Sequence, residues 1–227
     1  MKRHISKFKQ FGLTHIKHTC HSFDIKKYTI NEDGSIDVDG DVELCDKGLD
    51  EIPLDFNRVS GYFDCAGNKL TDLTGSPKSV GGVFDCAENE LKSLKYGPIS
   101  VGGDFYCEDN NLLGLTYLPK SLGGNIYANH NNLKNFIGIP EYFNNFLYIE
   151  NNPVYSICKL FSDDSTNILG RNASSKITLF NEYDIIRGNQ IILDRLNAFL
   201  GDIGKAEIDI NDKDKTKAVN FLKKVSH

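Results

Sequence analysis

The sequence lacks the long apolar segments that would place a protein in or across a membrane. No apolar run among its 227 residues approaches the roughly 18 to 20 residues that a membrane-spanning helix needs. Residues 1–23 are basic and are interrupted by Lys, His or Gln every few positions, so they do not resemble a signal peptide. We therefore expect no membrane partner and a cytoplasmic location, where the six cysteines would stay reduced.

Sequence motifs of the common catalytic sites are also missing. The chain contains no Gly-x-Ser-x-Gly, no phosphate-binding loop and no His-Glu-x-x-His. We accordingly expect a protein that is not an enzyme, has no catalytic residues and needs no cofactor. An enzyme confined to the last 73 residues, 155–227, is the least favoured of three functional hypotheses.

Charge is unevenly distributed along the chain. The net charge is only -5, from 26 Lys and Arg against 31 Asp and Glu. Residues 1–27 carry +6, residues 28–154 carry -12 and residues 155–227 carry +1. The middle of the chain is therefore strongly acidic behind a basic leader, which argues against direct binding to nucleic acid.

Internal repetition accounts for that acidic middle segment. Cys65, Cys86 and Cys107 are spaced 21 residues apart. The same step relates six further columns, which are Val59, Val80, Val101, Leu122 and Phe143; Phe63, Phe84, Phe105, Ile126 and Leu147; Asn68, Asn89, Asn110, Asn131 and Asn152; Leu70, Leu91, Leu112, Leu133 and Val154; Leu73, Leu94, Leu115 and Phe136; and Pro77, Pro98, Pro119 and Pro140. One step back gives a degenerate first unit at Val38, Val42, Leu49 and Ile52. Six units from about 38 to 154 predict a solenoid.

Each unit reads V-G-G-x-F-x-C-x-x-N-x-L-x-x-L-x-x-x-P. The alternating F-x-C segment predicts a short half-buried strand, and stacked units place these strands side by side in a parallel sheet. The Asn that follows is expected to turn inward and bond backbone groups of neighbouring units. The two Leu positions fill the core, and Pro lies on a return path that is extended or contains one 3₁₀ turn.

The unit resembles the leucine-rich repeat, L-x-x-L-x-L-x-x-N-x-L, with Phe, Cys and Leu inside. The segment from Tyr28 to Val154, including its entry, is similar to small leucine-rich repeat proteins encoded by bacteriophages. This resemblance implies the fold and an infected bacterial host, but no uniform activity. A likeness to bacterial effector repeats fused to a ubiquitin ligase is rejected, because 73 residues are too few for that domain and Cys158 has no acidic neighbour.

The fold class predicted is therefore α/β, a leucine-rich repeat solenoid of about six 21-residue units with a parallel concave sheet. We divide the chain into an N-terminal helix and hairpin cap (1–41), the repeats (42–154) and a C-terminal helical cap (155–227). The hairpin turns at Asn31-Glu-Asp-Gly34, and a helix should follow Asn189 and stop at Gly204. Residues 161–175 are expected to form a loop, and Ala218, Leu222 and Val225 suggest a final helix.

Two groups of metal-ligand types occur. His15, His18, Cys20 and His21 lie within seven residues, but their spacing matches no common zinc site and no second half is evident. We predict no metal here and favour a basic surface helix, with metal binding left as the open alternative. Cys65, Cys86 and Cys107 are interpreted as a reduced, packed column rather than a metal or disulfide ladder, because the column continues with Ala128 and Ile149.

Outward positions around the strands define a candidate binding face. Four columns of six positions contain ten carboxylates and no Lys or Arg. The carboxylates are Asp41, Glu43, Asp46, Asp64, Asp85, Glu88, Asp104, Glu108, Asp109 and Glu150, and Tyr106, Tyr127 and Tyr148 form a stripe toward the C-terminal half. Stacked like charges destabilise a sheet, so such an excess needs a reason other than decoration. We select Tyr106, Tyr127, Tyr148, Asp64, Asp85, Glu88, Asp104, Glu108 and Asp109 as partner-binding residues.

The leading hypothesis is a non-enzymatic protein-binding module that contacts a basic patch on a host or phage protein through this acidic, Tyr-lined face. In a phage setting the module would act on a host protein, as an inhibitor of a defence or nucleic-acid-handling protein. The alternative is a structural or assembly scaffold of the virion, in which repeats and caps serve only as a framework.

Overall fold

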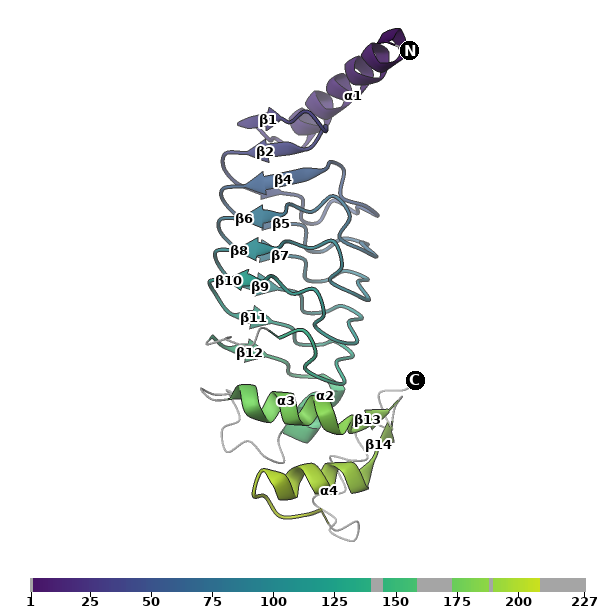
Figure 1. Cartoon of the computed structure of the whole chain (residues 1–227). Helices are drawn as coiled ribbons and strands as arrows, with labels where there is room; N and C mark the ends of the chain where they lie inside the picture. The colour runs from purple at the N-terminus through teal and green to yellow at the C-terminus, as the bar shows by residue number, and fades with distance from the viewer. Residues whose placement is uncertain (1, 140–144, 159–172, 188–189, 209–227) are drawn as a thin grey trace.

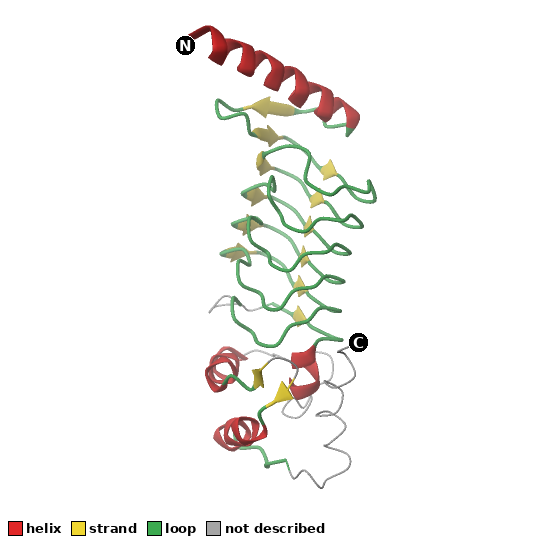
Figure 2. Cartoon of the chain, turned by 90° about the vertical axis from the view of Figure 1, so that its right-hand side faces the viewer, coloured by secondary structure: helices red, strands yellow, loops and turns green. Residues whose placement is uncertain are grey.

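The computed structural model describes residues 2–139, 145–158, 173–187 and 190–208. Its central part is a parallel β-solenoid with helices at both ends (Figure 1). The turns stack as a nearly straight column in Figures 1 and 2. The predicted repeat solenoid and its 21-residue step are therefore confirmed.

Each turn contributes two short strands, which form two sheets rather than the single sheet expected (Figure 2). Sheet A has the strand order β1 (Tyr28–Ile30), β2 (Ile36–Val38), β4 (Phe56–Val59), β6 (Ser79–Val80), β8 (Ser100–Val101) and β10 (Ser121–Leu122). Sheet B has the order β3 (Val42–Glu43), β5 (Phe63–Asp64), β7 (Phe84–Asp85), β9 (Phe105–Tyr106), β11 (Ile126–Tyr127) and β12 (Leu147–Tyr148). Pairing within these two sheets is parallel, except for the antiparallel β1–β2 hairpin. The Val column of the repeat thus belongs to a sheet of its own.

The Gly-Gly pair forms the corner between sheet A and sheet B. A Cβ atom on Gly102 would lie 2.1 Å from the carbonyl oxygen of Gly81, and one on Gly81 or Gly123 would meet the previous turn equally closely. No side chain fits at that separation. The corner glycines therefore let successive turns approach closely enough to pair their backbones, as in the 2.9 Å bond from Gly103 N–H to the carbonyl of Gly82.

The core is built from the inward columns. Phe63, Phe84 and Phe105 are buried, with ring centroids 5.7 and 5.2 Å apart along the stack. The Leu columns are also fully buried. Burial of these side chains is the main stabilising contribution of the fold, at roughly 1.5–3 kcal/mol for each large apolar side chain.

A ladder of buried asparagines links neighbouring turns, as the sequence predicted. Asn89 donates from its amide to the carbonyls of Cys65, Cys86 and Ala87, at 3.0 to 3.2 Å, and accepts from the N–H of Leu70 at 2.9 Å. The same pattern recurs at Asn110, Asn131 and Asn152. These amides satisfy backbone groups that the tight coil would otherwise bury without partners.

The N-terminal cap consists of α1 (Lys2–Ser22) and the predicted hairpin. At the end of α1, Cys20 is fully buried, while Ile16 and Phe23 pack partly against the core. Strand β2 pairs with β4, so the hairpin closes one end of sheet A. Both predictions for this segment, a helix and a hairpin, are confirmed.

The C-terminal cap contains α2 (Pro153–Cys158), α3 (Ala173–Tyr183), β13 (Ile186–Arg187), β14 (Gln190–Ile191) and α4 (Leu193–Asp202). The Phe136 N–H donates to the side-chain oxygen of Asn181 at 2.8 Å, whereas one turn earlier Leu115 donates to the backbone carbonyl of Ile137. The side chain of Asn181 thus supplies the hydrogen-bond acceptor that a further turn of the solenoid would otherwise supply. Phe180 adds an edge-on contact to Phe136, with ring centroids 5.3 Å apart.

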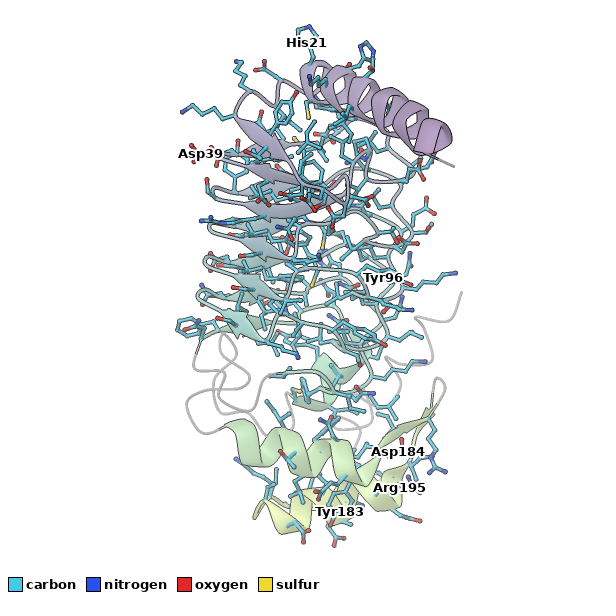
Figure 3. All side chains as sticks on the ribbon, turned by 45° about the horizontal axis from the view of Figure 1, so that its top comes forward. His21, Asp39, Tyr96, Tyr183, Asp184 and Arg195 are labelled. Atoms are coloured by element: carbon cyan, nitrogen blue, oxygen red, sulfur yellow. The ribbon has the colours of Figure 1, made fainter. Side chains whose placement is uncertain are left out.

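The predicted helix after Asn189 is confirmed as α4, which ends before Gly204 with its positive φ of 72°. An ion pair braces this cap: Arg195 bonds Asp184 at 3.0 Å, and the two side chains lie together beside Tyr183 in Figure 3. The expected loop over 161–175 is wrong at its end, because α3 begins at Ala173. Residues 161–172, the helix suggested by Ala218, Leu222 and Val225, and the column members Pro140 and Phe143 lie outside the described residues.

In the described part of the chain, no helix is long and apolar enough to cross a membrane.

Candidate interaction surface

The outer surface of sheet B carries one strand residue from every turn. These residues lie opposite one another in the parallel register and are Glu43, Asp64, Asp85, Tyr106, Tyr127 and Tyr148. Their side chains point outward because the neighbouring Phe and Cys positions point into the core. We call this row, with the acidic residues that flank it, the sheet B face. Its first half is acidic and its second half is aromatic.

The three tyrosines form a continuous stack. Ring centroids of Tyr106 and Tyr127 are 4.4 Å apart with planes at 5°, and those of Tyr127 and Tyr148 are 4.6 Å apart at 6°. Burial and the neighbouring Tyr127 and Asp104 raise the pKa of Tyr106 to about 12, so its hydroxyl stays protonated. Exposed Phe146 extends this aromatic region, with its ring 6.3 Å from that of Tyr148.

The acidic half consists of Glu43, Asp64 and Asp85, and the pairing of β5 with β7 places Asp64 opposite Asp85. One oxygen of each of these two Asp carboxylates accepts a local backbone N–H, from Ala66 and Ala87 respectively, at 2.9 Å. Burial, with Asp64 and Glu88 nearby, raises the pKa of Asp85 to about 6. Asp85 is therefore a carboxylate held in an environment that opposes its charge.

Three more of the selected residues lie just past the strands. Glu88 and Asp109 adopt positive φ angles of 52° and 50° at equivalent places in consecutive turns. Glu108 has one carboxylate oxygen, Oε2, that is buried without a hydrogen-bond partner among the described residues. Burial and the charges of Asp85 and Asp109 raise the pKa of Glu108. Asp109 itself contacts the ring of His130, with Oδ1 and Nδ1 2.9 Å apart.

Some acids on this face have structural partners. Asp41 accepts the N–H of Tyr62 at 2.9 Å, and Asp104 accepts that of Asn125 at 2.6 Å, one turn further along. The Tyr62 hydroxyl donates to Glu43 at 2.7 Å, an interaction that helps raise the pKa of Tyr62 to about 12. Bonding between turns thus accounts for Asp41 and Asp104, but Glu108 has an oxygen that no such bond explains.

The structure places all nine selected residues on or beside sheet B. It stacks the tyrosines on one another, aligns Asp64 with Asp85 and brings Glu108 near Asp85. Asp104 directly precedes β9, the strand that contains Tyr106, and the hydroxyl of Tyr106 donates to it at 3.5 Å.

The two groups of metal-ligand residue types, the His and Cys group of α1 and the Cys column of the repeats, differ in their surroundings. Cys20 faces the core, whereas His15, His18 and His21 are exposed, and the described residues contain no group of three or more metal-ligand side chains that could hold an ion. Cys65, Cys86 and Cys107 are buried free thiols, as the packed-column interpretation expects. Two of them donate to carbonyls of the next turn at 3.2 Å, and burial raises the pKa of all three.

Sequence reasoning missed a second pair of surface tyrosines. Tyr96 and Tyr117 lie on the return loops, 55% and 56% exposed, with positive φ angles of 69° and 75°. Gly75 and Gly138 occupy the same place in other turns and also have positive φ. The occurrence of Gly, Tyr, Tyr and Gly at one repeat position, at residues 75, 96, 117 and 138, was the available signal. Lys95 lies over the Tyr96 ring, 4.6 Å from its centroid, and Figure 3 shows Tyr96 on this loop edge.

Comparison of the chain with protein-family models, curated proteins and solved structures finds no match.

Proposed function

We propose that this protein is a non-enzymatic protein-binding module whose sheet B face binds a basic surface of a partner protein. The observation that carries the proposal is the continuous row in which stacked carboxylates pass into stacked tyrosines, without a Lys or Arg at any of the 24 positions of the four columns.

Charge supports this function because almost none of these carboxylates has a cationic partner among the described residues. The ion pairs of the described residues include only one on this face, between Asp109 and His130. Asp64 and Asp85 lie on adjacent strands, where like charges destabilise the pair by tenths of a kcal/mol. A basic partner would relieve that repulsion, and long-range attraction would speed its approach.

The tyrosine stack supports the same function. Its rings are held in place by one another, so little side-chain entropy would be lost on binding. Tyrosine is enriched in the buried centres of protein interfaces because it offers a large rigid surface with a polar tip. The acidic half would then steer a partner, and the aromatic half would supply contact area.

The resemblance to phage proteins extends the proposal to a host target. A host protein that handles nucleic acid or defends against phage has a basic groove, and an acidic face that filled such a groove would inhibit it. A virion scaffold is the alternative, and it predicts that the protein is recovered in purified particles.

A capture experiment tests the proposed function. The tagged protein is incubated with bacterial lysate beside two variants, one with Tyr106, Tyr127 and Tyr148 all changed to Ala and one with Tyr96 and Tyr117 changed to Ala as the matched control. We expect one basic protein to be retained by the wild type and by the control, to be lost by the triple variant, and to elute as salt is raised.

Each other outcome has a defined meaning. Retention by the triple variant would contradict the use of this face. Retention of the captured protein at high salt concentration would contradict the electrostatic part of the proposal. Circular dichroism of each variant, and a triple Tyr to Phe variant that keeps the stacked rings, separate loss of the surface from loss of the fold.

A further inference from the structure

The aromatic row has one end that meets a carboxylate. Tyr106 is the first ring of the stack, and Tyr127 covers one face of it at 4.4 Å. Because β7 pairs with β9 so that Asp85 lies opposite Tyr106, the other face of the ring looks toward the turn that carries Asp85. A flat aromatic surface and a carboxylate therefore lie one turn apart in the same outward row.

A second carboxylate points to the same place. Glu108 follows Tyr106 by two residues, so both side chains leave the same side of the chain. Its repeat position is occupied by Ala87 and Ala66 in the two preceding turns, so Glu108 is the first carboxylate of that column on the side of Asp85. Glu108 feels the charge of Asp85, and its Oε2 atom is buried without a hydrogen-bond donor among the described residues.

Neither of these two carboxylates forms an ion pair with a cationic side chain in the described part of the chain. The ion pairs there involve neither Asp85 nor Glu108. One oxygen of Asp85 accepts the N–H of Ala87, which leaves its other oxygen available to accept a hydrogen bond from a partner. Burying a carboxylate oxygen without a hydrogen-bond donor costs free energy. Because ionised carboxylates only accept hydrogen bonds, a group that donates several N–H bonds would suit this pair.

A guanidinium group fits that requirement better than an ammonium group. It is planar and weakly hydrated, so it can lie flat on an aromatic ring, and its five N–H groups can reach two carboxylates at once. A lysine ammonium is a compact charge that cannot cover the ring face. A metal ion is not favoured, because no group of three metal-ligand side chains converges among the described residues.

We propose that an arginine side chain of the partner lies against the Tyr106 ring, on the side of the Asp85 turn, and donates hydrogen bonds to the Asp85 and Glu108 carboxylates. This inference rests on the proposed function and names the residue of the basic partner that the sheet B face selects.

Two capped peptides of equal charge, tetra-arginine amide and tetra-lysine amide, test the inference by calorimetric titration of the full chain. Wild-type protein is expected to bind the arginine peptide about five- to tenfold more tightly. Asp85→Asn and Tyr106→Leu should reduce that ratio to about twofold or less. Asp85→Asn keeps the side-chain oxygen that accepts from Ala87, so it preserves the local turn. Tyr117→Leu, which changes an exposed tyrosine of a return loop outside the sheet B face, should leave the ratio unchanged and is the matched control.

Each result is decisive. Equal binding of the two peptides would overturn the arginine site while leaving a basic partner in place. An arginine preference that persists in Tyr106→Leu and Asp85→Asn would overturn its location. Binding of neither peptide by the wild type would overturn both the arginine site and the proposed function. Thermal unfolding of every variant shows whether a changed ratio reflects the site or the fold.

Discussion

The rings of Tyr106 and Tyr127 lie 4.4 Å apart with their planes at 5°. Strand spacing alone would hold them about 4.8 Å apart, so the parallel register presents them for stacking and side-chain packing closes the gap. The same register aligns Asp64 with Asp85 at the other end of the row. Attraction between tyrosines and repulsion between carboxylates are therefore consequences of one repeated geometry.

The stack should contribute to stability through its middle member. Tyr127 contacts a ring on each side, and an aromatic pair is worth about 0.5–1.5 kcal/mol. Tyr127→Ala is expected to lower the free energy of unfolding by about 1–3 kcal/mol, measured by urea denaturation. Tyr127→Phe keeps the rings and should change it by less than about 0.5 kcal/mol. Equal effects of the two substitutions would show that ring stacking is not the source of the stabilisation.

Substitutions in the asparagine ladder should lower the free energy of unfolding more than substitutions at surface positions. Asn110 donates to the carbonyls of Cys86, Cys107 and Glu108 and accepts from Leu91. Asn110→Ala leaves these buried groups without partners and should lower the free energy of unfolding by about 3 kcal/mol or more. Its exposed neighbour supplies the control, since Asn111→Ala should cost less than about 0.5 kcal/mol. A loss below about 1 kcal/mol at Asn110 would contradict the role of the ladder.

The corner glycines should not tolerate a methyl group. In Gly102→Ala the new Cβ would fall 2.1 Å from a backbone oxygen of the previous turn, so adjacent turns must separate. We expect a loss of about 3 kcal/mol or an insoluble protein, measured by thermal and urea unfolding. Gly12→Ala is the control, because nothing lies within 4 Å of that position in α1 and alanine favours helix by up to about 1 kcal/mol. Unchanged stability of Gly102→Ala would contradict the close approach of the turns.

Asp85 should make the folded state less stable as pH rises. Its pKa is about 6 in the folded chain against an ordinary value of 3.8, so between these values the folded state holds a proton that the unfolded state has lost. The stabilising contribution is complete below about pH 4 and is lost as pH rises through 6. Asp85→Asn should therefore raise Tm at pH 7 and have a smaller effect at pH 4.

Asp72 provides a control of opposite sign for that pH experiment. Bonds from Thr74 lower the pKa of Asp72, so its contribution to stability is present above its unfolded pKa and is lost as pH falls. Asp72→Asn should accordingly lower Tm at pH 7. A decrease in Tm at pH 7 for Asp85→Asn would contradict the account of Asp85 as a carboxylate held against its preference.

The repeat register explains why much of the fold could be predicted from sequence. The Phe, Asn and Leu columns each hold one residue type at one step, and each column has one physical role, so the stacked strands and the asparagine bonds followed from spacing. Sheet A was missed because its central strands contain two residues, such as Ser79–Val80, and only the Val of each recurs as an apolar signal. The Gly-Gly pair that follows is visible in the repeat pattern, but the pattern does not show that it forms the corner between the two sheets.

The candidate surface was predictable in membership but not in detail. Alternation identified the outward column, and the register then aligned Asp85 with Tyr106. The buried oxygen of Glu108 depends on how its side chain lies against small neighbours, which no linear pattern records. The positive φ of Tyr96 and Tyr117 is not apparent from tyrosine itself, which rarely adopts that conformation, and only the glycines at the equivalent positions 75 and 138 indicate it.

The central claim is that the sheet B face binds a basic partner, and the salt dependence of affinity tests it most directly. The partner captured from lysate is titrated against the wild type and the triple Tyr106, Tyr127 and Tyr148 to Ala variant at 50 and 200 mM salt, between which the Debye length falls about twofold. We predict that wild-type affinity falls at least about tenfold between the two salt concentrations and that the triple variant binds at least about a hundredfold more weakly than the wild type at the lower one. Affinity that is unchanged by salt and by the three substitutions would contradict the claim.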